Sequence, residues 1–409
     1  MLAADASFVR SALVDLVLGD DRVALAAARA TAAQERWPNV IQLAVAWRLI
    51  PQLRDALARV GDTASGCIDE ASFGLLRRHL LARAAESAAI VRGCGQVQRV
   101  LQDGGVTSVA IKGVASIATL YGASSRRMLC DIDLVVDPGQ LDAARAALAR
   151  ADFADVSPPW DRHNAAITFS RYLHNYARTF VRDGIEVDLH WQLGRRPPAA
   201  LRAQAIVEGS IAARVEGAAL RVSGPVHTAL LAVHHALRNS FPSESTPKDI
   251  ADLRIWWERM GDEYGAAFVS ETLASGFGSS LCALARTIVH RAPAHPIARC
   301  AEAVDARLSR AERREAARLG AFIEHNVRSG APDNVTVEMM APAMFARSIA
   351  ALPHVVAWEV QGDPAIKRRP LVARIGNRLR RAGRIGRELL RFERVATYRA
   401  VARAQRRFH

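Results

Sequence analysis

The sequence is poor in cysteine and has no long hydrophobic run. Its five cysteines are odd in number and widely spaced, with no C-x-x-C pair. This argues against a disulfide framework or a zinc knuckle and indicates a reducing compartment. No apolar stretch approaches the roughly 18–20 residues of a membrane span, and the first residues, MLAADASFVRSALVDLVLGDD, carry acids where a secretory signal is basic. We therefore expect a cytoplasmic protein without a transmembrane segment.

Several common catalytic motifs are also absent. The chain has no G-x-x-x-x-G-K-[ST] loop, no G-x-G-x-x-G after a β-rich run, no H-E-x-x-H and no G-x-S-x-G. Their absence argues against a P-loop, a dinucleotide-binding fingerprint, a zincin-type zinc site and a hydrolase nucleophile elbow.

Acidic residues are scarce in one part of the chain. The net charge is +14, but residues 367–409 hold 15 Lys and Arg against 2 Asp and Glu, whereas the rest of the chain is nearly neutral. Within this tail, Leu371, Ile375 and Leu379 recur four residues apart between arginines, which predicts an amphipathic cationic helix. Either the helix docks on the protein body, or it binds an anionic partner such as RNA, a membrane surface or an acidic protein.

Length and patterning divide the chain into four parts, because 409 residues exceed one ordinary domain. Residues 1–104 show apolar positions at helical spacing, and residues 105–200 combine β-rich runs with helices. Residues 201–360 again read as helical, and residues 361–409 form the basic tail. We predict an α+β fold, in which a small mixed sheet with helices is flanked by N-terminal and C-terminal helical regions.

The run MLCDIDLVVDPGQ, residues 128–140, places two acids inside a β-forming segment. On a strand, Asp131 and Asp133 project from the same face about 6.5 Å apart. Carboxylates among apolar residues need a cation to offset their burial, and this spacing suits one or two divalent ions in a phosphoryl-transfer site. The alternative is an edge strand with both aspartates on the surface.

A third acid lies on a predicted hairpin. The segment ARTFVRDGIEVDLHWQL reads as two strands joined by Asp183–Gly184, and Asp188 lies on the second strand. His190 alternates onto the same face, where it is either a partner of the site or a packed structural histidine. His174, shortly before this hairpin, is a weaker candidate for a substrate contact.

Positive charge and backbone flexibility occur close to the aspartates. Lys112–Gly113 follows the β-rich run VTSVAI and opens a helix, an arrangement that favours phosphate. Arg126 and Arg127 precede the aspartates and offer fork-shaped donors. Further along, Lys248, Asp249 and Asp252 open another helix, where acids complement the helix dipole; a substrate contact is the alternative for these three.

Taken in order, AIKGVASIATLYG, RRMLCDIDLVV and IEVDLHW resemble the uncharacterised nucleotidyltransferase family of the DNA polymerase β superfamily, over residues 105–195. The resemblance implies a polymerase β-like core that binds Mg²⁺ or Mn²⁺ and moves a nucleoside monophosphate from an NTP to a hydroxyl acceptor, releasing pyrophosphate. It implies Asp131, Asp133 and Asp188 as the catalytic metal ligands. It also implies Lys112, Gly113, Ser116 and Arg127 as contacts of the NTP.

Two features depart from the superfamily pattern. Lys-Gly replaces the usual Gly-Ser, so that Ser116 is the nearest hydroxyl. The methionine of the R-x-M-x-D pattern is shifted, since Met128 directly follows Arg127. The acceptor stays open among small molecules, peptides, proteins and RNA. Two other functions also stay open: a catalytically degenerate binding protein anchored by its basic tail, and a toxin-type nucleotidyltransferase acting on tRNA or protein.

Overall fold

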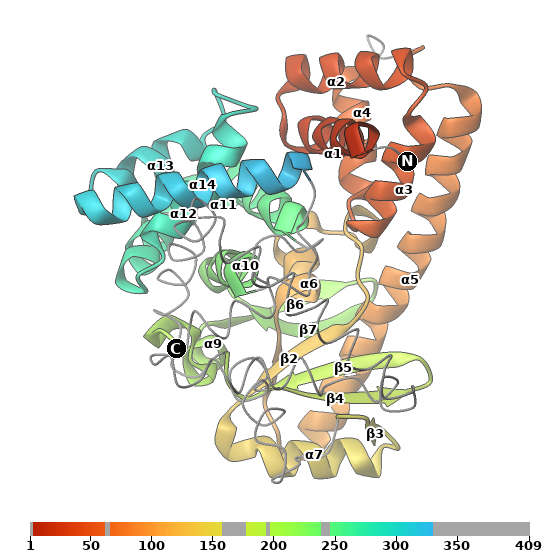
Figure 1. Cartoon of the computed structure of the whole chain (residues 1–409). Helices are drawn as coiled ribbons and strands as arrows, with labels where there is room; N and C mark the ends of the chain where they lie inside the picture. Colours follow the sequence, from red (N-terminus) through yellow and green to blue (C-terminus); the bar gives the residue numbers. More distant parts are fainter. Residues whose placement is uncertain (1–2, 62–65, 158–176, 194–196, 239–245, 330–409) are drawn as a thin grey trace, which may run out of the picture.

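The computed structural model describes residues 3–61, 66–157, 177–193, 197–238 and 246–329. The predicted basic tail and His174 lie outside these residues, so that nothing about either is tested. Across the described part of the chain, a mixed sheet lies beside an N-terminal and a C-terminal group of helices, which contact each other (Figure 1). This arrangement confirms the predicted α+β fold with helices before the core.

The N-terminal group contains α1–α4, and a much longer helix, α5, runs from this group past the sheet (Figure 1). Asp69 caps α5 by accepting a hydrogen bond from the Ser72 amide. Prolines near the starts of α3 and α4 suit the first helical turn, where no intrahelical partner is needed. The helices are α1 (Ala3–Leu18), α2 (Asp21–Ala33), α3 (Trp37–Ala46), α4 (Ile50–Val60) and α5 (Glu70–Asp103).

The sheet has seven strands in the order β3-β4-β5-β2-β1-β7-β6. The central strand β2 pairs antiparallel with β1 and parallel with β5. The predicted hairpin is confirmed as β4 and β5, and both turn residues, Asp183 and Gly184, have the positive φ that a tight two-residue turn requires. The strands are β1 (Ser108–Ala110), β2 (Ile132–Val136), β3 (Ala154–Asp155), β4 (Ala177–Arg182), β5 (Ile185–His190), β6 (Ser210–Val215) and β7 (Ala218–Ser223).

Strands β6 and β7 correct the expectation that the chain is helical from residue 201. They form an antiparallel hairpin, and Val222 of β7 pairs parallel with Ala110 of β1. The sheet therefore continues to Ser223, beyond the predicted boundary at residue 200. The two strands contain four alanines, and because alanine is a weak strand former, their pairing depends on the rest of the sheet.

The two faces of the sheet have different environments. On one face, Ile132, Leu134 and Val136 pack in a cluster with residues of α5 and α7. On the other face, Val135 belongs to the cluster formed by the N-terminal and C-terminal helices. Because side chains alternate along a strand, Asp133 shares the second face. The shorter elements around the sheet are α6 (Lys112–Ser116), η2 (Ile117–Tyr121), η3 (Ser124–Arg126), η4 (Pro138–Gln140), α7 (Leu141–Arg150), η5 (Ala199–Leu201) and α9 (Ala203–Glu208).

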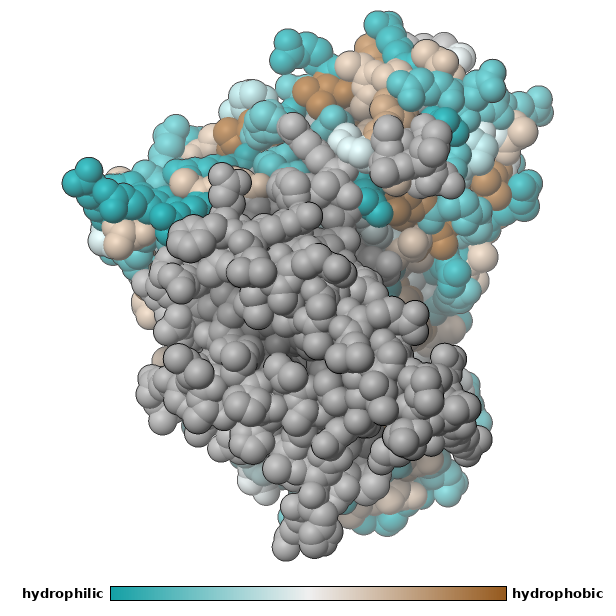
Figure 2. All heavy atoms as spheres, in the orientation of Figure 1, coloured by the Kyte–Doolittle hydropathy of each residue, from teal (hydrophilic) through white to brown (hydrophobic). Residues whose placement is uncertain are grey.

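The C-terminal group packs around α11, where Trp256 and Phe268 are fully buried with ring centroids 4.9 Å apart. The outer surface over α13 and α14 is largely hydrophilic (Figure 2). No described helix combines the length and the apolar character needed to cross a membrane. The helices are α10 (Pro225–Arg238), α11 (Thr246–Ala274), α12 (Gly278–Val289), α13 (Ile297–Asp305) and α14 (Arg310–Ser329).

A buried arginine joins the two helical groups. The guanidinium of Arg291, which follows α12, donates to Asp15 of α1 at 2.8 Å and to Glu324 of α14 at 2.9 Å. The Arg291 side chain is buried, whereas both carboxylates are partly exposed. This arginine therefore fixes α1 against α14.

We expect Arg291→Met to lower the free energy of unfolding by about 2 kcal/mol, because it leaves two partly buried carboxylates without their cation. Urea denaturation followed by circular dichroism measures the change. Arg286→Met is the control, since Arg286 forms an exposed pair with Asp305 that contributes little. Equal effects of the two substitutions would contradict this role of Arg291.

Candidate functional site

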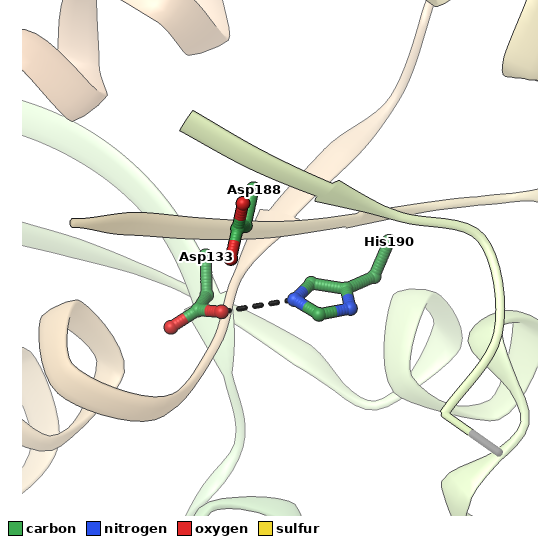
Figure 3. A group of neighbouring side chains, drawn as sticks. All are labelled: Asp133, Asp188 and His190. Atoms are coloured by element: carbon green, nitrogen blue, oxygen red, sulfur yellow. Dashed lines mark hydrogen bonds and ion pairs between the residues drawn. The ribbon is translucent and has the colours of Figure 1, made fainter. Parts of the chain in front are cut away.

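Three side chains converge where β2 and β5 run side by side. Asp133 and Asp188 are direct partners in the parallel ladder, and His190 follows two residues later on β5. One ligand atom from each lies within 4.8 Å of the others, which makes this a group able to hold a metal ion. Figure 3 shows the three side chains pointing toward one another from the two strands.

Asp133 is buried and accepts two hydrogen bonds on the same oxygen. Its Oδ1 lies 2.6 Å from Lys112 Nζ and 2.9 Å from His190 Nε2. Burial alone raises the pKa of a carboxyl, but Lys112 and His190 outweigh burial and lower the pKa of Asp133 well below its ordinary value. The carboxylate is therefore ionised at neutral pH and able to act as a metal ligand.

Asp131 differs from the prediction in one respect. Strand β2 begins at Ile132, so that Asp131 precedes the strand instead of lying on it. Its side chain still lines the same cavity as Asp133. Burial, followed by the nearby charge of Asp133, raises the pKa of Asp131, and within the described residues its carboxylate has no hydrogen-bond or ion-pair partner. An added cation would remove this cost.

Lys112 and Gly113 have tertiary contacts that the sequence does not reveal. Lys112, expected to face phosphate, bonds the Asp133 carboxylate instead. At Gly113, an added Cβ would lie 2.5 Å from Leu129 Cδ2 and 2.7 Å from Arg127 Nη1. Any larger residue at position 113 would therefore force the Arg127 and Leu129 side chains to shift, and the buried ion pair of Arg127 opposes such a shift.

Arg127 forms a buried ion pair with Asp252 of α11. Its Nε lies 3.0 Å and its Nη2 2.7 Å from Asp252 Oδ2. The hydroxyl of Tyr121 donates to Asp252 Oδ1 at 2.7 Å, and Gln52 of α4 donates to that hydroxyl at 3.1 Å. The interpretation of Asp252 as a helix-start acid is wrong, because its carboxylate joins α11 to the core and to the N-terminal helices.

A cavity of about 370 Å³ opens beside these residues. It includes every predicted NTP contact, Ser116 among them, together with side chains from α10, α11 and the loop between α3 and α4. Sequence reasoning missed Arg48, because no motif surrounds it; its positive φ of 59° is visible only in the structure. The arginine, lysine, aspartate and histidine residues that line the cavity are Arg48, Lys112, Arg127, Asp131, Asp133, His235, Lys248, Asp249 and Asp252.

We expect Gly113→Ala to destabilise the protein by about 1–3 kcal/mol, because the methyl group overpacks the contact with Leu129 and Arg127. The urea unfolding midpoint gives this change. Gly74→Ala in α5 is the matched control: its Cβ would meet only Arg78 Nη1, at 3.6 Å, and alanine favours the helix. An unchanged midpoint for Gly113→Ala would show that the cleft wall yields at this point.

Comparison with known proteins agrees with the geometry. The profile of a family described as uncharacterised nucleotidyltransferase matches residues 33–293. No curated protein and no solved structure gives a significant match. The matched region covers the sheet, the aspartates and the helices that line the cavity, and it confirms the resemblance found in the sequence. Because the match spans more than half of the chain, the protein belongs to the uncharacterised nucleotidyltransferase family.

Proposed function

We propose that the protein transfers a nucleoside monophosphate from an NTP to a hydroxyl acceptor with the help of a divalent metal ion. The observation that carries this proposal is the pairing of Asp133 and Asp188 on adjacent parallel strands, with Asp131 lining the same cavity as Asp133. Family membership supports the reaction class. The acceptor stays open, and a toxin-type enzyme differs from this proposal only in its acceptor.

The donor set fits a hard divalent cation. Carboxylate oxygens from Asp131, Asp133 and Asp188 are the ligands that Mg²⁺ and Mn²⁺ prefer, and the imidazole of His190 is a further donor more typical of transition metals. We assign the metal to these residues, and the metal would give the Asp131 carboxylate a direct ligand contact that no described side chain provides. When bound, the metal supplies charge for the phosphates and lowers the pKa of the acceptor hydroxyl.

The protein's own side chains orient these ligands. The hydroxyl of Thr179 donates to Asp188 Oδ1 at 2.7 Å from the neighbouring strand β4, which fixes the carboxylate on the strand. Lys112 and His190 fix Asp133 in the same way. Such preorganisation is what a positioning-based phosphoryl transfer requires.

Incubation with each α-³²P-labelled NTP, Mg²⁺ or Mn²⁺ and a host lysate tests the reaction. We expect label on one lysate component with the wild type, and a loss of at least about a thousandfold with Asp133→Asn or Asp188→Asn, because both remove charge from the metal site. Asp142→Asn is the control, since Asp142 is almost fully exposed on α7.

Label that persists in both site variants would contradict the assigned ligands. If wild type transfers no label from any NTP, the non-catalytic binding protein becomes the better account.

Metal binding without NTP gives a second test. Because Lys112 bonds the same Asp133 oxygen that a cation would need, we expect Lys112→Met to tighten Mn²⁺ binding roughly tenfold and Asp188→Asn to weaken it. Electron paramagnetic resonance of free Mn²⁺ measures both. Weaker binding by Lys112→Met would show that Lys112 supports the metal site instead of competing for it.

A further inference from the structure

The cations of the cavity divide into two kinds. Lys112 bonds Asp133, and Arg127 bonds Asp252, so that each has a carboxylate partner within the protein. Arg48 and Lys248 line the same cavity. Among the residues that the structure describes, their side chains have no hydrogen bond and no ion pair. These two cations are therefore the ones available to a ligand.

Lys248 is the more unusual of the two, because its side chain lines the cavity with only 7% of the residue exposed. Burial lowers its pKa, and the positive charges of Arg127 and Arg48 add to that effect. An ammonium removed from water without a partner is unfavourable. A bound anion would remove this penalty.

The acids next to Lys248 on α11 are already engaged. Asp249 lies 2.7 Å from His235 Nδ1 of α10, and Asp252 accepts from Arg127 and Tyr121. The remaining unpaired carboxylate of the cavity is Asp131, which the proposed metal uses. The charges of Asp249 and Asp252 partly offset the burial of Lys248, but among the described residues of the cavity wall no carboxylate forms an ion pair with it.

Arg48 reaches the cavity from the N-terminal helices. It lies in the short loop between α3 and α4 with a φ of 59°, a region that non-glycine residues rarely adopt. Backbone hydrogen bonds hold the loop, since the Arg48 amide donates to Val45 and the Leu49 amide donates to Ala44. The guanidinium is therefore carried by a fixed backbone, and its charge is close enough to Lys248 to lower the pKa of that lysine.

We propose that Arg48 and Lys248 form a polyphosphate subsite that takes the β- and γ-phosphates of the NTP. The subsite complements the carboxylates. The cavity offers acids for a metal at the start of β2, and it offers two cations without an ion pair for phosphate, Lys248 from α11 and Arg48 from the α3–α4 loop. A guanidinium and an ammonium are the usual protein partners of phosphate. The inference rests on the proposed function for the identity of the anion, and it makes the N-terminal helices part of the site.

Tripolyphosphate in EDTA isolates this subsite, because no metal is then available to the aspartates. In isothermal titration with the full chain, we expect the wild type to bind, and Arg48→Met and Lys248→Met to bind at least tenfold more weakly. Arg99→Met is the control, since it removes an equal charge from an exposed position on α5 outside this cavity. Binding by both site variants at wild-type strength would overturn the proposal.

A second readout separates a ligand-binding lysine from a structural one. Lys248→Met removes a buried charge without a protein partner, so we expect its urea unfolding midpoint without ligand to equal or exceed that of the wild type. A clear fall in the midpoint would show that Lys248 supports the fold, and would overturn its assignment. A Lys248→Met variant that does not fold has the same meaning as a lower midpoint. In that case the binding test is made with Arg48→Met.

Titration with Mg²⁺ and an NTP distinguishes two sources of the phosphate. We expect Arg48→Met and Lys248→Met to weaken binding of the NTP in parallel with tripolyphosphate. Loss of tripolyphosphate binding alone would assign the subsite to a phosphorylated acceptor and overturn the assignment to the NTP. If wild type transfers label without binding tripolyphosphate, only the subsite fails; if it binds tripolyphosphate at these residues but transfers no label, the proposed function fails.

Discussion

The buried ion pair between Arg127 and Asp252 is the contact on which the cleft depends. It joins the segment that leads into β2 to α11, and Tyr121 and Gln52 extend it to α4. The core and both helical groups therefore meet at one carboxylate. Separating Arg127 from Asp252 would leave two buried charges uncompensated, so that the pair keeps α11 against the segment that leads into β2.

That contact also decides which charges remain for a ligand. Arg127 forms an ion pair with Asp252, and Lys112 forms one with Asp133. Both cations therefore already have a carboxylate partner within the protein. The charged side chains of the cavity that form no ion pair within the described residues are Asp131, Arg48 and Lys248. A metal bound to a triphosphate carries both signs of charge and fits such a cavity.

The sequence predicted those features that local patterns specify. Alternating apolar residues and an Asp-Gly turn placed the hairpin and Asp188, and the apolar run around Asp133 placed β2. The β6–β7 hairpin was missed because its strands contain four alanines and pair only in the context of the sheet. The role of Asp252 was missed because its partner lies 125 residues away in the chain, a distance at which no periodicity operates.

We propose that this cleft binds a metal–NTP complex, with the metal on the aspartates and the β- and γ-phosphates on Arg48 and Lys248. A crystal structure with Mn²⁺ and a non-hydrolysable NTP analogue tests it most directly, because anomalous scattering locates the metal. We predict Mn²⁺ between Asp133 and Asp188, and the β- and γ-phosphates against Arg48 and Lys248. An analogue bound outside the cavity, or a triphosphate held by Lys112 and Arg127 without Arg48 and Lys248, would contradict the account.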